Sequence, residues 1–157
     1  MDTRPCTRCR STTKPTVLES TASESDSLAL RIERMPVLTC PEGHRQFVSP
    51  EFPRWLVEHL MDEDEAKLPS GREEGMIFKH YRCGECGADL AKEPERRETF
   101  AFDVELLDLQ PFHVELTAPV YRCPKCSREQ LHSLKEVRKL TPEALVHAFK
   151  EAGISSG

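Results

Sequence analysis

Apolar and polar side chains alternate in two parts of the chain, and this period of two residues predicts half-buried β-strands. In the first part the alternation runs through Leu28, Leu30 and Ile32. The second part falls into two runs, and segment 108–111 separates them as a hairpin connection. The apolar positions of these runs are Phe100, Phe102, Val104 and Leu106, followed by Phe112, Val114 and Leu116. We therefore expect antiparallel strands in both halves of the chain.

Helical patterns follow the strands in both halves. Ser49-Pro50-Glu51 and Thr141-Pro142-Glu143 each supply a hydroxyl N-cap, a proline for the first helical position and an acid in the first turn. Apolar side chains at helical spacing follow both signals, and Gly153 ends the second helix. A separate helix, with the apolar residues of 131–140 on one side, is expected before Thr141.

Two polar segments interrupt these patterns. Residues 20–27 read STASESDS and are expected to form a loosely held insertion. Residues 62–75 begin with the acidic run Asp62-Glu63-Asp64-Glu65 and are expected to form a solvated connection between two units. The apolar residues 76–78 then form a short approach to the second half of the chain.

Seven cysteines and one histidine fall into two sets of four with the spacing of tetrahedral zinc sites. A Cys-x-x-Cys turn brings two sulfurs to one side of a tight loop, and two facing turns supply the four ligands that structural Zn²⁺ prefers. The alternatives are iron, redox use of the thiols, or a pairing of turns between the two halves. We expect two structural zinc ions, one bound by Cys6, Cys9, Cys40 and His44, and one by Cys83, Cys86, Cys123 and Cys126.

A short sequence motif recurs just before the second ligand turn of each set. Pro36-Val37 stands two residues before Cys40-Pro41, and Pro119-Val120 stands two residues before Cys123-Pro124. This repetition predicts an internal duplication of one structural unit. The expected fold class is a small, zinc-stabilised α+β protein, with two zinc-ribbon-like antiparallel units that are each followed by helix. The expected domains are a first ribbon with its helix over 1–66, a linker over 67–75, and a second ribbon with the C-terminal helices over 76–157. The two units could also pack against each other as an intramolecular pseudo-dimer.

Composition favours metal ligation over other ways of holding two small domains together. Only 38% of the 157 residues are hydrophobic and 6% aromatic, so each unit has little apolar surface to bury. Zinc binding adds its free energy directly to folding. An odd number of cysteines and the lack of an apolar signal segment favour a reducing, cytoplasmic location over a disulfide framework. No apolar run is long enough to cross a bilayer.

Enzymatic patterns are weak in this sequence. A thioredoxin-like pair requires one isolated Cys-x-x-Cys motif, whereas this chain contains three. His113-Val114-Glu115 upstream of Cys123 and Cys126 is similar to the signature of zinc deaminases, but that interpretation would leave Cys83 and Cys86 unused. His113 and Glu115 are better explained as surface partners across a strand pair. We therefore expect a protein without catalytic residues.

The combination of a Cys-x-x-Cys turn, a strand-rich insert, a Pro-Val approach and a second two-ligand turn resembles the YgiT-type zinc finger. The resemblance covers Cys6–His44 and, as a second copy, Cys83–Cys126. In that family the zinc module forms the N-terminal half of some bacterial antitoxins and binds the toxin, and a helix-turn-helix domain follows it and reads DNA. In this chain a second ribbon occupies that place. The resemblance therefore implies protein binding through the ribbon.

Charge separates two hypotheses for function. The formal charge of −5, which bound thiolates make more negative, disfavours general affinity for nucleic acid. The first hypothesis is therefore a non-enzymatic tandem zinc-ribbon protein that acts as a protein-interaction or regulatory module. Phe52 and Trp55 could serve its interface or its core. The alternative is a nucleic-acid-binding regulator that uses Tyr121 for stacking and a basic segment formed by Arg122, Lys125, Arg128, Lys135, Arg138 and Lys139.

Overall fold

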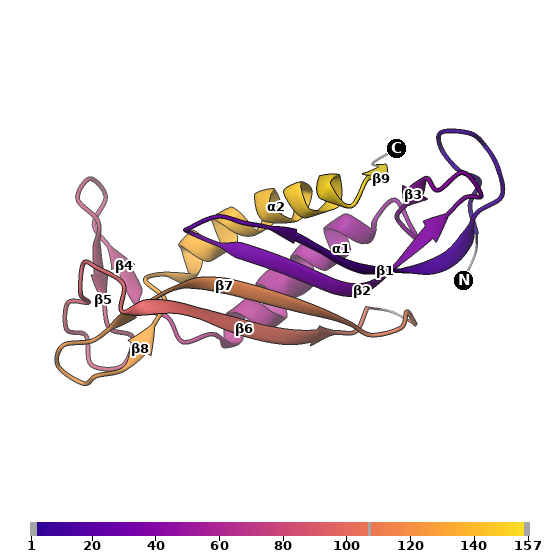
Figure 1. Cartoon of the computed structure of the whole chain (residues 1–157). Helices are drawn as coiled ribbons and strands as arrows, with labels where there is room; N and C mark the ends of the chain where they lie inside the picture. The colour runs from indigo at the N-terminus through magenta and orange to yellow at the C-terminus, as the bar shows by residue number, and fades with distance from the viewer. Residues whose placement is uncertain (1–2, 107, 156–157) are drawn as a thin grey trace.

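The computed structural model describes residues 3–106 and 108–155 and shows a small α+β protein. One long, twisted and mainly antiparallel sheet carries two α-helices on the same face (Figure 1). The helices are α1 (Phe52–His59) and α2 (Leu134–Glu151). The four long strands are β1 (Lys14–Ser23), β2 (Ala29–Thr39), β6 (Arg96–Val104) and β7 (Phe112–Arg122).

The long strands form two hairpins that lie head to tail. β1 pairs with β2, β6 pairs with β7, and the hairpins join where β2 pairs antiparallel with β7, from Ala29 opposite Thr117 to Glu33 opposite His113. Because this pairing is antiparallel, the open ends of the two hairpins point to opposite ends of the molecule (Figure 1). The two sequence units therefore share one sheet, while the domain boundaries at residues 66 and 75 stay a prediction.

Five short strands complete the described part of the chain. β3 (Arg45–Gln46) continues the sheet beside β2, and β9 (Ile154–Ser155) pairs in parallel with β3. At the other end β8 (Glu129–Gln130) pairs with β7. β4 (Arg72–Glu74) and β5 (His80–Arg82) form a separate two-stranded hairpin that projects from this end (Figure 1).

The alternation in the sequence correctly predicts which side chains face the helices. Phe112, Val114 and Leu116 are buried, whereas the residues between them face the outer side of the sheet and are half-buried. Residues 108–111 lie in the connection between β6 and β7, as expected, and the Leu109 N–H donates to the Leu106 carbonyl at 3.0 Å, the usual length for such a bond. The hydrophobic pattern thus fixes the inner face of the sheet.

The first helix begins two residues later than its sequence signal. The N-cap position belongs to Glu51, and no side chain caps it. The Ser49 hydroxyl accepts a hydrogen bond from the Glu51 N–H at 3.3 Å, and Pro50 lies in the preceding turn. The prediction of Ser49 as the N-cap was therefore wrong, because its side chain closes a local turn before the helix starts. After His59 the chain continues through a π-helical turn, Leu60–Asp64 (η1), and a 3₁₀ turn, Glu65–Lys67 (η2).

The second helix is one continuous element, and the prediction of two helices that meet at Thr141 was wrong. Its N-cap is Ser133, whose side chain accepts a hydrogen bond from the Lys135 N–H at 3.1 Å. Pro142 lies inside the helix, and the buried Thr141 hydroxyl donates to the Val137 carbonyl at 2.8 Å. The burial of the helix face that carries Thr141 therefore outweighs the tendency of Thr141-Pro142-Glu143 to begin a new helix. The helix ends before Gly153, which has a φ of +69°.

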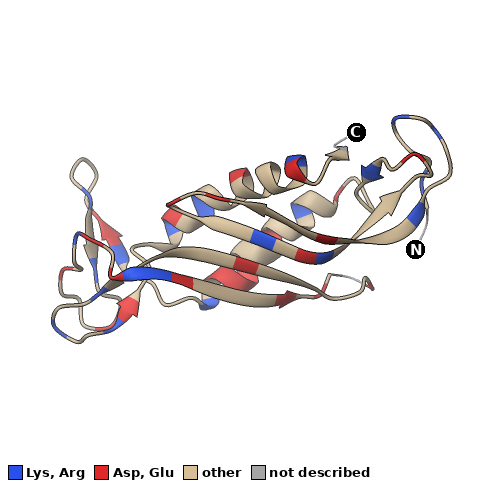
Figure 2. Cartoon of the chain, in the orientation of Figure 1, with Lys and Arg blue, Asp and Glu red and all other residues tan. Residues whose placement is uncertain are grey.

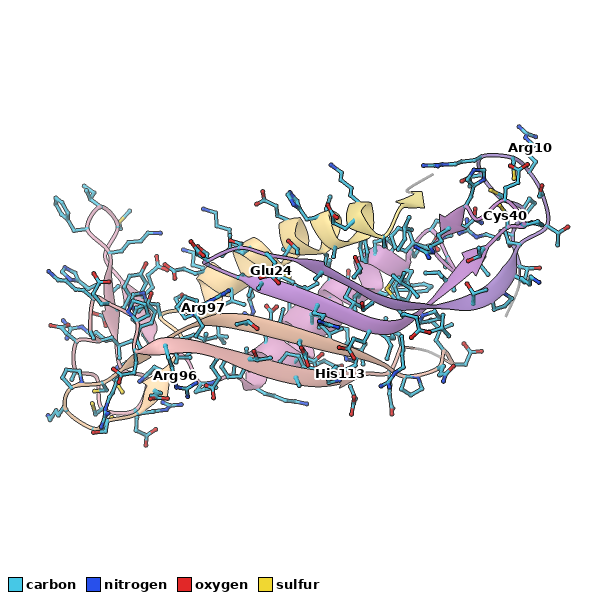
Figure 3. The ribbon with its side chains drawn as sticks, in the orientation of Figure 1. Arg10, Glu24, Cys40, Arg96, Arg97 and His113 are labelled. Atoms are coloured by element: carbon cyan, nitrogen blue, oxygen red, sulfur yellow. The ribbon has the colours of Figure 1, made fainter. Side chains whose placement is uncertain are left out.

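Both polar segments contain buried residues, so the expectation of a loosely held insertion and of a solvated connection was wrong for those parts of them. Residues 20–23 belong to β1, and the buried Thr21 hydroxyl donates to the Ala148 carbonyl of α2 at 2.6 Å. Ser25 lies in the turn after β1, and its carbonyl accepts from the Arg97 guanidinium at 2.8 Å (Figure 3). Asp64 and Glu65 of the acidic run are buried, and Glu65 accepts a hydrogen bond from Thr141 of α2.

One hydrophobic core connects both hairpins and both helices. Phe52 of α1 is fully buried and packs against Phe47 and Phe112, with 6.0 Å between ring centres in each pair. Phe149 of α2 meets Phe47 edge to face at 4.9 Å. Trp55 is partly buried and packs on the same cluster, so both aromatic side chains of α1 belong to the core. In the described part of the chain, no helix has the length and apolar character that a bilayer crossing requires.

Candidate metal centres

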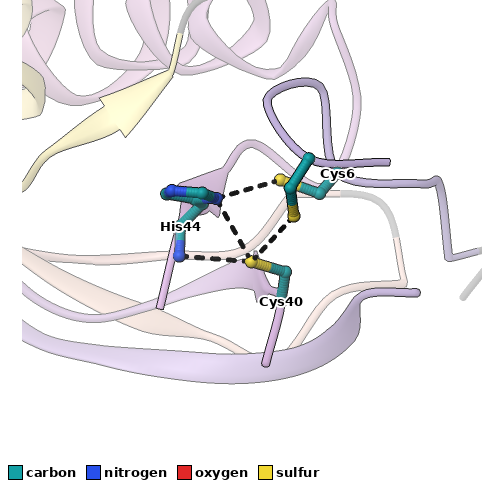
Figure 4. Close-up of side chains that lie close together, drawn as sticks. Cys6, Cys40 and His44 are labelled. Atoms are coloured by element: carbon teal, nitrogen blue, oxygen red, sulfur yellow. Dashed lines mark hydrogen bonds between the residues drawn. The ribbon is translucent and has the colours of Figure 1, made fainter. Parts of the chain in front are cut away.

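The open end of each long hairpin carries one cluster of four potential metal ligands. Cys6 and Cys9 lie in the loop before β1, Cys40 directly follows β2, and His44 directly precedes β3. The Nδ1 atom of His44 lies 3.5 Å from Cys6 Sγ and 3.4 Å from Cys40 Sγ, and Cys9 Sγ lies 3.7 Å from Cys40 Sγ (Figure 4). A tetrahedral zinc ion would place sulfur pairs about 3.8 Å apart and sulfur–nitrogen pairs about 3.5 Å apart. The cluster therefore has the dimensions of a metal site.

The second cluster lies at the far end of the molecule and contains only sulfur. Cys83 Sγ lies 3.6 Å from Cys126 Sγ, and Cys86 Sγ lies 3.5 Å from Cys123 Sγ. In each cluster all four ligand atoms lie within 4.8 Å of one another. The structure therefore brings together the same two sets of four that the spacing predicts, and each set could hold a metal ion.

Backbone geometry explains why these turns gather the sulfurs. In all three Cys-x-x-Cys turns the carbonyl of the first cysteine accepts from the N–H four residues later, at 2.9–3.0 Å. Each of these turns ends in a left-handed residue, as does the wider Cys-x-x-x-His turn. In each of the three Cys-x-x-Cys turns, the N–H of the first cysteine also donates to the carbonyl five residues later, at 2.7–2.9 Å. The left-handed residues are Arg10, Gly43, Gly87 and Ser127.

A buried glutamine supports the first turn of each cluster. Gln46 of β3 accepts from the Thr7 N–H at 3.0 Å, and Gln130 of β8 accepts from the Gly84 N–H at 2.8 Å. Thr7 and Gly84 each follow the first cysteine of their cluster. Gln46 lies opposite Leu38, and Gln130 lies opposite Tyr121, so the two glutamines occupy matching places beside β2 and β7. The sequence analysis missed both residues, because no local spacing links them to the cysteines.

The two glutamines use their amino groups differently. Gln130 Nε2 donates to Cys83 Sγ at 3.2 Å, whereas Gln46 Nε2 donates to the Pro5 carbonyl at 3.2 Å. Burial opposes ionisation of Cys83, but hydrogen bonds from the Cys86 backbone and from Gln130 outweigh it and lower the pKa of that thiol to about 6. A four-thiolate site carries one more negative charge than a site with three thiolates and a neutral histidine. The additional N–H donor, Gln130 Nε2, therefore lies at the cluster whose thiolates carry the larger negative charge.

The segment between β4 and β5 is an exposed apolar finger next to the second cluster. We define the finger as Met76, Ile77 and Phe78, which are 97%, 87% and 80% exposed. As the sequence suggests, these residues precede the second cluster, since the chain continues from them through β5 to Cys83, but the tight hairpin leaves their side chains in solvent. Gly75 makes that turn possible, since its φ is +97° and an added Cβ would lie 2.2 Å from the Phe78 carbonyl oxygen.

The finger is tied to the second cluster at its base. β5 leads directly into Cys83, and the Tyr81 ring stacks on His132, with 4.1 Å between ring centres. The Tyr81 hydroxyl also donates to the Glu136 carboxylate of α2. In the finger itself, by contrast, no described apolar side chain is buried. A rigid base therefore presents a solvent-exposed tip.

The residues considered for catalysis lie on the outer face of the sheet. His113 Nδ1 lies 3.2 Å from Asp103, its partner across the β6–β7 pair, and His113 Nε2 lies 3.3 Å from Glu115 (Figure 3). The hydrogen bond with Asp103 raises the pKa of His113, although partial burial opposes this effect. The contact with Asp103 confirms His113 as a partner across a strand pair, whereas Glu115 contacts His113 along the same strand.

Several residues of the basic segment already make contacts with other parts of the chain. Arg138 donates to the Met61 carbonyl at 3.2 Å, and Arg128 lies 3.7 Å from the Glu85 carboxylate. The Tyr121 ring stacks on His132 at 3.2 Å between ring centres, on the side opposite Tyr81. Basic and acidic residues are interspersed at this end of the molecule (Figure 2). Acidic residues therefore interrupt the basic segment at this end of the molecule (Figure 2).

Comparison with known proteins adds no family to this description. No protein-family model matches the chain, and no curated protein or solved structure matches it significantly.

Proposed function

We propose that the chain is a non-enzymatic zinc-binding protein in which two structural metal ions hold a protein-interaction module together. The observation that carries this proposal is the apolar finger, Met76–Phe78, which is almost fully exposed and is attached to the second metal cluster. Three consecutive large apolar side chains at a hairpin tip do not stabilise the isolated fold. Such exposed apolar groups mark sites of interaction with another protein.

The ligand chemistry supports zinc as the metal. Four thiolates, or three thiolates and one imidazole, at tetrahedral separations are the donor sets of structural zinc sites. Hard cations such as Mg²⁺ and Ca²⁺ prefer oxygen ligands instead. Four protein ligands complete the coordination of each ion, so neither centre offers the open position that catalytic zinc uses. The proposed role of the metal is therefore to hold the fold.

Native mass spectrometry tests the metal assignment. We expect two zinc ions in the wild-type protein and one in each of the variants Cys40→Ser and Cys123→Ser. The two variants serve as controls for each other, because the clusters lie at opposite ends of the molecule (Figure 1). One ion in the wild type, or iron in either centre, would overturn the assignment.

Affinity capture with quantitative mass spectrometry tests the role of the finger. A variant with Met76, Ile77 and Phe78 replaced by serine should keep two zinc ions and lose the proteins that the wild type captures. Val17→Ser is the matched control, because Val17 is also apolar and exposed but lies on β1, away from the finger. If the captured proteins are the same with and without the finger, the proposed interaction role is wrong.

Nucleic-acid binding through the basic segment is the alternative function. Arg122, Lys125, Lys135 and Lys139 are exposed and support it, whereas Tyr121 is already stacked and Arg138 points inward. A salt-dependent mobility shift with nucleic acid that disappears when Arg122 and Lys125 are reversed to glutamate would favour this alternative over the interaction module.

A further inference from the structure

A second apolar surface lies on the helical face of the molecule. It is a groove between α1 and the C-terminal half of α2, with a volume of about 580 Å³. Val146, in the groove, is 49% exposed, which is unusual for a large apolar side chain of this protein. The apolar side chains of the groove include Pro53, Val57, Leu145, Val146, Phe149 and Ile154.

The finger cannot reach the groove of its own chain. The finger projects from the end of the molecule that holds the second metal cluster, whereas the groove lies beside β9, toward the first cluster (Figure 1). The sheet and α2 extend between these two ends. Contact between finger and groove therefore requires two copies of the chain.

We propose that the finger of one copy docks in the α1–α2 groove of a second copy, and that the contact is reciprocal. This inference rests on the proposed role of the finger as an interaction element and identifies its partner. A reciprocal pair uses both fingers and both grooves, whereas a single contact would leave one of each uncovered and allow open-ended chains.

The area of such a contact agrees with a stable dimer. A fully covered aromatic side chain buries about 150–250 Å². Met76, Ile77 and Phe78 are of comparable size and together bury up to about 500 Å², whereas the concave groove loses a much smaller area than the tip that enters it. Two such contacts bury about 1,300 Å² in total, which is at the lower end of the range for stable protein interfaces, about 1,200–2,000 Å².

The charges near the two surfaces permit the contact. The tip of the finger carries no charged side chain, so its insertion removes no charge from water (Figure 2). At the groove, Arg54 and Glu58 lie 3.9 Å apart and form an ion pair on the exposed side of α1. Neighbouring Glu73 at the base of the finger pairs with Lys79 at 2.9 Å. Lys150 of α2 also lines the groove. Both surfaces therefore have an apolar centre with charged side chains around it, which is the usual arrangement at protein interfaces.

Sedimentation velocity on the zinc-loaded protein tests the pair. We expect a concentration-dependent dimer, and we expect Phe78→Ser in the finger and Val146→Glu in the groove each to weaken dimerisation at least tenfold. Val17→Glu is the matched control, because it adds the same charge at a similarly exposed valine on β1, 43% against 49% for Val146, and should leave the dimer unchanged. A monomer at all concentrations up to about 1 mM, or open-ended oligomers, would overturn the inference.

Photo-crosslinking identifies the contact directly. Benzoylphenylalanine in place of Phe78 should crosslink to groove peptides of an isotope-labelled second copy, from residues 53–58 of α1 or residues 142–154 of α2 and β9. Crosslinks to any other part of the second copy would overturn the inference. A monomer that nevertheless captures another protein through the finger would overturn this inference and leave the proposed function standing. Loss of both behaviours would contradict both proposals.

Discussion

At the scale of single residues, two glutamines connect the sheet to the metal centres. Gln46 and Gln130 are both buried, and each holds the N–H that follows the first cysteine of its cluster. Only Gln130 also donates to a ligand sulfur. Donors around a metal ligand fix its orientation and tune its charge. The second centre should therefore depend on its glutamine more strongly than the first.

Replacement of Gln130 by leucine should weaken zinc binding at the second centre by about 10- to 100-fold. The reason is that leucine removes the donor to Cys83 Sγ and leaves the Gly84 N–H without its acceptor. Gln46→Leu is the matched variant and should have a smaller effect, confined to the first centre. Cadmium-113 NMR resolves a four-sulfur from a three-sulfur site and reports each centre separately during chelator competition. Equal losses at both centres would contradict the special role of Gln130.

The buried carboxyl of Glu65 makes the stability of the protein depend on pH. Its carboxyl is fully buried, accepts from the Thr141 hydroxyl at 2.6 Å, and lies near Arg138 and Asp64. Burial raises the pKa of Glu65 to about 7, although the hydrogen bond from Thr141 and the charge of Arg138 lower it. The folded state therefore binds this proton more tightly than the unfolded state. The resulting stability is fully present below pH 4.5 and is lost as the pH rises toward about 7.

Glu65→Gln should therefore stabilise the protein at pH 8, by up to about 3 kcal/mol, because the amide carries no charge to bury. The difference between variant and wild type should shrink as the pH falls from 8 to 6. Urea unfolding of both zinc-loaded proteins across this range gives the free energies of unfolding. A difference that does not change with pH would show that Glu65 does not titrate as described.

At the scale of elements, the continuous helix α2 shows where local signals fail. Thr141-Pro142-Glu143 has the composition of a helix start, yet the chain remains helical through it because Thr141, Leu145 and Phe149 are buried on the same face. The true start, Ser133, has a capping hydroxyl without the following proline. Long-range packing therefore decides the position of the boundary, and that packing cannot be read from the local sequence.

Pro142→Ala distinguishes the two descriptions of this segment. In a continuous helix, proline lacks one N–H and crowds the preceding turn, so alanine should raise the free energy of unfolding by up to about 3 kcal/mol. At the first position of a separate helix proline is favourable, and alanine would have no effect or a destabilising one. Chemical denaturation of the zinc-loaded proteins measures the difference.

Other elements could be predicted because their signals are local. The strands β6 and β7 follow from strict alternation, and the ligand turns follow from cysteine spacing. The pairing of β2 with β7 could not be predicted, since any exposed strand edge offers the same backbone groups. Thr21 and Ser23 were missed because small polar side chains in a strand have no apolar signal, although α2 covers them.

At the scale of the whole molecule, the two candidate metal centres lie at opposite ends of one core, and metal bound there would act on each end separately. The second centre fixes Cys83 and, through β5, the base of the finger. The first centre fixes the ends of β1 and β2 and the start of β3. Since the sheet and the core lie between them, each centre should control the order of its own end while the shared core persists.

Hydrogen exchange should reveal this division. In Cys123→Ser the amides of β4 and β5 should exchange at least about tenfold faster than in the wild type, while those of β3 and β9 keep their protection. Cys40→Ser should produce the opposite pattern. Central amides of β7 serve as an internal reference in both variants. Uniform loss of protection in either variant would show that one centre supports the entire fold.

The pairing of β2 with β7 also has a consequence for biosynthesis. Ile32 meets Val114, so the edge partner of β2 is made about 80 residues after β2 itself. At a synthesis rate of about 5–20 residues per second, the first hairpin waits roughly 4–16 s with one edge and one apolar face uncovered. During this interval the ligands of the first cluster, which are all present by residue 44, can already capture an ion and close the hairpin at its open end. Early metal supply on the ribosome would then protect the nascent chain from aggregation until its second half arrives.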